Sequence, residues 1–113
     1  MITLNLKREP YWIDLLDGVS LYVRPATTAL IMAARACTLK ENIESDVERA
    51  SALIRHLGQL AILEWKGVGD SDGNLAPVTA ETVGALFDLW PVSEAFERLY
   101  LTPALLLEQE KNG

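Results

Sequence analysis

Strict alternation of apolar and polar residues marks the beginning of the chain. Residues 2–7 (Ile-Thr-Leu-Asn-Leu-Lys) alternate without a break, a pattern typical of a half-buried β-strand. Residues 11–23 alternate again on either side of Asp17-Gly18, a dipeptide that favours a β-hairpin. A three-residue loop, Leu16-Asp17-Gly18 with a left-handed Gly18, separates the two faces well, whereas a two-residue loop would place Asp14 on the apolar face. The predicted opposing pairs are Leu15 with Val19, Ile13 with Leu21, and Tyr11 with Val23, and the other face then holds Trp12, Asp14, Ser20 and Tyr22.

Beyond residue 25 the apolar residues recur at helical spacing. Thr27 or Thr28 can cap a helix that runs to about Leu39. The capping box at residues 45–48 (Ser-Asp-Val-Glu) predicts a second start, and an apolar stripe continues from there to Trp65. Gly67 can adopt a positive φ just beyond the last turn, so we expect this longest helix to end near Lys66, with Val68 folding back on Leu63. Gly58 inside it indicates a close crossing with another helix.

Shorter helices are predicted after a polar, glycine-containing loop at residues 69–76. Thr79 caps a helix that Pro91 ends, because the residue before a proline is pushed out of the α region. Ser93 caps the next helix, and Thr102-Pro103 begins a last one that covers residues 104–111. The expected fold class is α+β, with a small N-terminal antiparallel β-sheet (hairpin) in residues 1–25. A predominantly helical bundle of about five helices follows in residues 26–113, and residues 1–113 form a single domain.

The charge of the chain limits its partners. A formal net charge of −6 disfavours phosphate backbones and anionic lipid surfaces. The sequence contains neither a membrane-spanning apolar run nor a basic-then-apolar signal sequence. Its single cysteine, Cys37, excludes an internal disulfide and fits a reducing compartment. We therefore expect a soluble cytoplasmic protein that binds neither nucleic acid nor membrane.

Residues with possible chemistry do not form a recognisable catalytic or metal site. Asp70, Asp72 and Asn74 resemble calcium ligands, but alignment of Gly73 with the invariant EF-hand glycine puts Val68 at the first ligand position, so we interpret the loop as a polar turn. The only histidine, His56, lacks a carboxylate and a nucleophile at a suitable spacing. A Cys37–His56 dyad stays open, although no motif favours it. The sequence predicts no enzyme, no cofactor and no metal.

Aromatic residues in the second half of the chain allow two interpretations. They can form the core of the C-terminal helices, or one or two of them can line an apolar groove that binds a partner segment. These residues are Trp65, Phe87, Trp90, Phe96 and Tyr100.

Four short motifs, taken in order and spacing, point to a family. They are Glu64-Trp65-Lys66-Gly67-Val68-x-Asp70-x-x-Gly73, Pro77-Val78-Thr79, Phe96-x-x-x-Tyr100-x-x-Pro103 and Glu110-Lys111-Asn112. Together with the hairpin that leads into residues 21–25, they resemble the tail assembly chaperones of long-tailed, siphovirus-like phages and prophages. The resemblance covers most of the chain and implies a small acidic protein without enzymatic activity.

The resemblance also implies partners and a location. It implies that the chain binds the tape measure protein and keeps it soluble during tail tube assembly, with the tail tube protein as a possible second partner and homo-oligomers possible. It places the chain in the host bacterial cytoplasm and outside the mature virion. The candidate partner-binding residues are Trp65, Gly67, Val68, Trp90, Phe96 and Tyr100. Two alternatives stay open: a minor structural protein of the tail or neck, and a small acidic regulator that binds a host protein.

Overall fold

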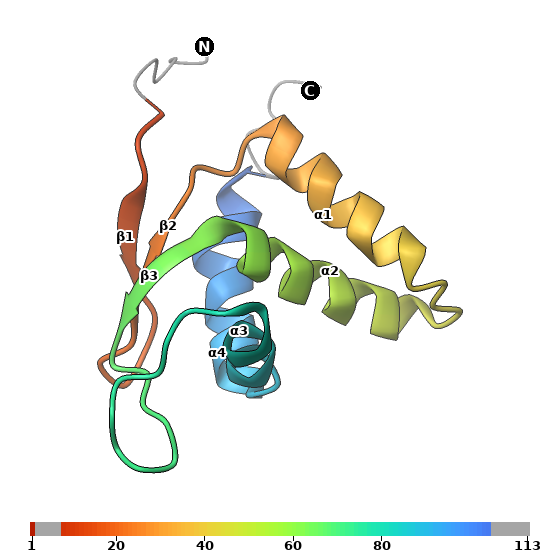
Figure 1. The fold of residues 1–113 in the computed structure, drawn as a ribbon. Coiled ribbons are helices and arrows are strands. Elements are labelled where there is room, and N and C mark those ends of the chain that lie inside the picture. The colour runs from red at the N-terminus through yellow and green to blue at the C-terminus, as the bar shows by residue number, and fades with distance from the viewer. Residues whose placement is uncertain (2–7, 105–113) are drawn as a thin grey trace.

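A computed structural model describes Met1 and residues 8–104, and it has the expected α+β architecture (Figure 1). The elements are β1 (Tyr11–Asp14), β2 (Ser20–Val23), α1 (Thr28–Lys40), α2 (Asp46–Ala61), β3 (Ile62–Lys66), α3 (Ala80–Phe87), α4 (Trp90–Phe96) and a π-helical turn, η1 (Glu97–Leu101). The antiparallel sheet has the order β1-β2-β3, and the helices lie on one side of it (Figure 1). The strand predicted at residues 2–7 and most of the helix predicted at 104–111 lie outside the described residues. No helix within the described part of the chain is both long and apolar enough to cross a membrane.

The hairpin has the register predicted from the sequence. Tyr11 lies opposite Val23 and Ile13 opposite Leu21. The turn is closed by hydrogen bonds from the Leu15 amide to the Val19 carbonyl, at 2.9 Å, and from the Val19 amide to the Leu16 carbonyl, at 2.8 Å. Gly18 is left-handed as expected, with φ of 76°, and Asp17 shares this conformation with φ of 49°. On the solvent face Ser20 donates to Asp14 at 2.6 Å, and the rings of Trp12 and Tyr22 lie 5.1 Å apart.

The prediction that the longest helix continues to Lys66 is wrong. Helix α2 ends at Ala61, and Ile62 turns to an extended conformation with ψ of 122°. The next residues form β3, in which Trp65 pairs with Leu21, so the predicted helix-end contact between Val68 and Leu63 does not apply. The physical reason is that the second edge of β2 has backbone groups that need partners, and β3 supplies them. Gly67 has the predicted positive φ, 79°, but it follows a strand.

Three of the predicted helix starts, those capped by Thr27, Ser45 and Thr79, are confirmed. Thr27 accepts a hydrogen bond from the Leu30 amide at 3.2 Å, and Ser45 accepts one from the Glu48 amide at 3.3 Å. Thr79 caps α3 and exchanges hydrogen bonds with Thr82 in a complete capping box. These contacts satisfy amides that have no partner within the helix.

The predicted boundaries around α4 are wrong. Leu89 is the N-cap of α4, and Pro91 lies in the first turn, where a missing amide costs no hydrogen bond. Ser93 lies inside the helix and donates its hydroxyl to the carbonyl of Phe87, which ties α4 to α3. Thr102 has helical angles after η1, so it continues the helical segment instead of capping a new helix.

The core lies between the sheet and the C-terminal helices. Its largest fully buried side chains are Leu21, Val23, Leu57, Val83, Phe96 and Tyr100. The ring of Phe96 lies between two other rings: its centroid is 4.8 Å from that of Tyr100, on which it stacks, and 4.9 Å from that of Phe87, to which it is tilted by 45°. Gly58 in α2 allows this packing, because a Cβ at that position would overlap the ring of Phe87. The close helix crossing predicted at Gly58 is therefore confirmed.

Candidate docking groove

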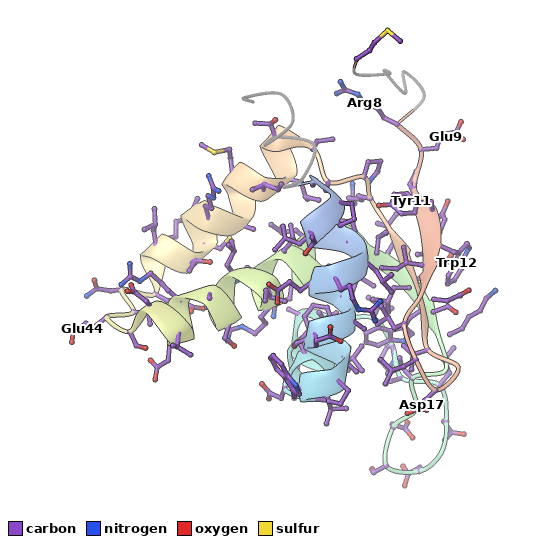
Figure 2. All side chains as sticks on the ribbon, turned by 180° about the vertical axis from the view of Figure 1, so that it is seen from behind. Arg8, Glu9, Tyr11, Trp12, Asp17 and Glu44 are labelled. Atoms are coloured by element: carbon purple, nitrogen blue, oxygen red, sulfur yellow. The ribbon has the colours of Figure 1, made fainter. Side chains whose placement is uncertain are left out.

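An apolar groove of about 360 Å³ opens where the hairpin turn, the segment after β3 and the α3–α4 junction meet. Asp17 marks the hairpin turn in Figure 2. The residues that line this groove, which we call the turn groove, are Leu16, Asp17, Val19, Gly67, Val68, Gly69, Leu86, Leu89, Pro91 and Val92. Asp17 is the one charged residue among these described lining residues. A hollow of this size and composition suits apolar side chains of a partner.

Close contact between two glycines shapes the turn groove. A Cβ on Gly67 would overlap the carbonyl oxygen of Gly18, so the backbone after β3 lies directly against the hairpin turn. The positive φ of Gly67 turns the chain away from the sheet at this point. As a result Val68, which is half-buried, is held in the wall of the groove.

The loop that follows is a polar turn, as the sequence predicts, and backbone and side-chain hydrogen bonds close it. The Ala76 amide donates to the Val68 carbonyl at 2.9 Å, and the Asp70 amide donates to the Asn74 carbonyl at 2.8 Å. The Asp70 carboxylate accepts from the amides of Asp72, at 2.9 Å, and Asn74, at 3.0 Å. Asp70 therefore stabilises the turn. Within Met1 and residues 8–104, no three His, Cys, Asp or Glu side chains are placed to share a metal ion.

An exposed apolar edge borders the turn groove at the start of α4. Leu89 is 56% exposed, and Trp90, the first residue of the helix, is 72% exposed. Leu89 and Pro91 line the groove on either side of Trp90 in the sequence. Large exposed aromatic and aliphatic side chains next to an apolar hollow are typical of protein-binding surfaces.

The structure separates the six candidate partner-binding residues into two groups. Gly67 and Val68 line the turn groove, and Trp90 is exposed and lies in the sequence between its lining residues Leu89 and Pro91. The other three belong to the core: Trp65 is 5% exposed, Phe96 0% and Tyr100 2%. These three support the walls from behind and do not form the accessible surface.

Hydrogen bonds fix two of the core aromatics. The indole Nε1 of Trp65 donates to the Ala76 carbonyl at 2.8 Å, which joins β3 to the end of the polar turn. The Tyr100 hydroxyl donates to the Arg24 carbonyl at 2.6 Å. Burial, with a smaller effect of nearby Tyr11, raises the pKa of Tyr100 well above its ordinary value, so the hydroxyl keeps its proton at neutral pH.

Several residues of the turn groove are not among the contact residues that the sequence predicts. They are Leu16, Val19, Leu89 and Pro91, which the sequence places in a hairpin and at a helix end. A usable signal is present at residues 89–91 (Leu-Trp-Pro), three consecutive apolar residues at the junction of two helices. Apolar side chains at the junction of two helices are covered less completely than those in the middle of a helix, so some of them stay exposed.

The only histidine has a carboxylate partner that its sequence spacing did not reveal. His56 Nε2 lies 2.8 Å from Glu41 Oε1, and Arg55 Nη2 lies 2.8 and 3.0 Å from the two Glu41 oxygens. Glu41 is the C-cap of α1, and the two basic residues belong to α2. Among the described residues, the hydrogen bond of this imidazole is to a carboxylate and not to a hydroxyl or thiol. The cluster therefore clamps the α1–α2 connection.

We expect this clamp to make stability depend on pH under acidic conditions. The hydrogen bond from His56, followed by the hydrogen bond and charge of Arg55, holds the pKa of Glu41 below its ordinary value of 4.5, although desolvation partly opposes them. A lowered pKa in the folded state contributes stability above the unfolded pKa and loses it as pH falls through the folded pKa. Glu41→Gln should therefore melt below the wild type at pH 7, and the gap should close as the pH falls below 4.5.

The control for this prediction is Glu9→Gln, an exposed carboxyl outside the helices and strands. Its melting curve should follow the wild type across the same pH range. A gap for Glu41→Gln that stayed constant down to pH 2 would contradict the electrostatic explanation and indicate a purely steric effect.

Comparison with known proteins adds no family. No protein-family model, no curated protein and no solved structure matches the chain. Support for a function therefore comes from the turn groove and from the sequence motifs.

Proposed function

We propose that this protein is a tail assembly chaperone that binds the tape measure protein through the turn groove and keeps it soluble while the tail tube assembles. The main support is a coincidence of position. The motif residues Gly67 and Val68 lie in the wall of an apolar groove, and the exposed Trp90 lies in the sequence between two of its lining residues, Leu89 and Pro91.

The physical task explains why such a surface is useful. A long helical protein with apolar faces exposes surface that aggregates until its final partner encloses it. An escort needs an apolar groove to cover part of this surface and a charged exterior to keep the complex in solution. The turn groove provides the apolar surface, and the net charge of −6 provides the charged exterior. Binding is apolar and of the helix-in-groove type, with weak dependence on salt.

The same proposal includes how the protein acts, where it acts and which second partner it has. The chain acts by binding and without catalysis, in the cytoplasm of the bacterial host, and it leaves before the particle is complete. The tail tube protein is the second partner. Displacement by the tube requires moderate affinity, which a single shallow groove provides.

Co-expression with the tape measure protein of the same operon tests the proposal. The wild-type chain should raise the soluble fraction of the tape measure protein and co-elute with it in size-exclusion chromatography. Trp90→Ala and Val68→Asp should weaken the complex about tenfold or more, as expected for loss of an apolar contact residue worth ~1–2 kcal/mol. Trp65 and Tyr100 are unsuited to this test because their replacement disturbs the core.

Trp12→Ala is the matched control. Trp12 is also an exposed aromatic residue, 40% exposed, but it contacts Tyr22 and Lys66 on the solvent face of the sheet. This variant should protect the tape measure protein as well as the wild type. A tape measure protein that stays insoluble and forms no complex would overturn the proposal, and recovery of the chain from purified particles would favour a structural tail protein.

A further inference from the structure

A second apolar groove lies between the far halves of α1 and α2, which extend side by side away from the sheet (Figure 1). It encloses about 260 Å³ and is lined by Arg35, Thr38, Leu39, Arg49, Ala50 and Leu53. We call it the helix groove. Glu44, at the tip of this helical hairpin, and Asp17, at the turn of the β-hairpin, lie on opposite sides of the molecule (Figure 2). The helix groove is therefore separate from the turn groove.

The floor of the helix groove presents almost only apolar groups. The Thr38 hydroxyl donates to the Ala34 carbonyl of its own helix at 2.9 Å, so its proton is not available to a ligand. Leu39 is 73% exposed, and Val47, near the start of α2, is 80% exposed. The volume is below the roughly 300–1,000 Å³ of small-molecule pockets, so one or two aliphatic side chains fit it better than a whole small ligand.

The rim of the helix groove has a charge opposite to that of the chain as a whole. Arg35 and Arg49 line it, one from each helix, and no carboxylate is among the described lining residues. Arg49 pairs with Asp46 at 2.9 Å and donates to the Glu44 carbonyl at 3.0 Å. Arg35 forms no ion pair with any described residue. In a chain with a net charge of −6, this local basic rim attracts carboxylates that flank an apolar surface.

We propose that the helix groove docks an amphipathic helix of a partner protein whose apolar stripe is flanked by Asp or Glu side chains. An aliphatic side chain of that helix enters the hollow between Leu39 and Leu53, and a neighbouring carboxylate meets Arg35. Residues on a helix at spacings of three and four share one face, so a single helix presents both groups together. This inference does not depend on the proposed function, because the turn groove uses different residues.

Two synthetic helices test the proposal directly. Both are fluorescein-labelled, about 18 residues long and carry the same leucine stripe, but one is flanked by Glu and the other by Lys. Fluorescence anisotropy should show that the Glu-flanked helix binds the full chain at least about tenfold more tightly at low salt, and that added salt narrows this difference. Equal binding of the two helices, or binding of neither, would overturn the proposal.

Charge reversal of Arg35 provides the second measurement. Arg35→Glu should remove the preference for the Glu-flanked helix, and Leu39→Asp should weaken both helices. Arg98→Glu is the matched control, because Arg98 is an exposed arginine on η1, and it should bind like the wild type. Circular dichroism must show that each variant is folded. An unchanged preference in Arg35→Glu would overturn the proposal, as would a dimer of the free chain that Leu39→Asp abolishes, since a second copy would then occupy the groove.

Discussion

Replacing Phe96 by alanine should lower the free energy of unfolding by about 3–5 kcal/mol, the largest effect expected for a single side chain in this protein. Phe96 is 0% exposed, and its ring lies between those of Phe87 and Tyr100. The substitution removes the buried ring, both aromatic contacts and the support of α4 against the core, and it leaves a cavity. Urea unfolding followed by circular dichroism measures the change.

Trp90→Ala is the control for this prediction because it removes a larger aromatic side chain from the same helix. Trp90 is 72% exposed, so its loss should change stability by less than about 0.5 kcal/mol. Comparison of the two variants separates the effect of burial on stability from the effect of losing an aromatic ring. A decrease of less than about 1 kcal/mol in the free energy of unfolding of Phe96→Ala would mean that the three aromatic rings contribute little to the stability of the core.

Replacing Gly67 by valine should lower the free energy of unfolding by about 2–5 kcal/mol, from two separate causes. A β-branched residue at a φ of 79° is strained by about 1–2 kcal/mol. The new side chain also overlaps the Gly18 carbonyl, and overpacking against fixed backbone costs about 1–3 kcal/mol more. The melting temperature and the urea midpoint should both fall.

Gly73→Val isolates the first of these causes. Gly73 has a φ of 84°, but no atom lies within 4 Å of a Cβ at this position. This variant should therefore lose only about 1–2 kcal/mol. Equal losses for the two variants would show that the hairpin turn yields to the new side chain and that the contact with Gly18 is not a constraint.

The parts of the fold that the sequence predicted correctly depend on neighbouring residues. The hairpin register follows from Asp17-Gly18 and from the alternation beside it. The starts of α1, α2 and α3 follow from Thr27, Ser45 and Thr79, each of which bonds an amide three residues later. Such contacts form within one turn, so the local sequence contains the information.

The errors arise where distant residues decide the structure. Ala61 and Trp65 have the spacing of a helix, but Trp65 also pairs with Leu21 on β2, a partner far away in the sequence. The spacing of apolar residues could not show that the second edge of β2 needs a neighbouring strand. Pro91 was equally ambiguous, since a proline both follows the end of one helix and fits the first turn of the next.

The candidate site could be predicted only in part, because some of its features are local in the sequence and others depend on distant residues. Gly67 could be found because a positive φ restricts the residue type, and its place in the turn groove follows from the same turn. Composition alone could not tell the exposed Trp90 from the buried Trp65. Exposure depends on which elements cover a side chain, and these elements come from distant parts of the sequence.

The pairing of β3 with β2 has a consequence for the order in which the nascent chain folds. The β-hairpin can close soon after it leaves the ribosome, because all of its contacts are local. The outer edge of β2 then has no partner until α1, α2 and Ile62–Lys66 have been synthesised. During this interval an open strand edge, with Leu21 and Val23 not yet covered, can pair with other chains. Slow synthesis before Ile62–Lys66 leaves the ribosome should therefore increase aggregation of this protein, whereas a pause after this segment has emerged should not.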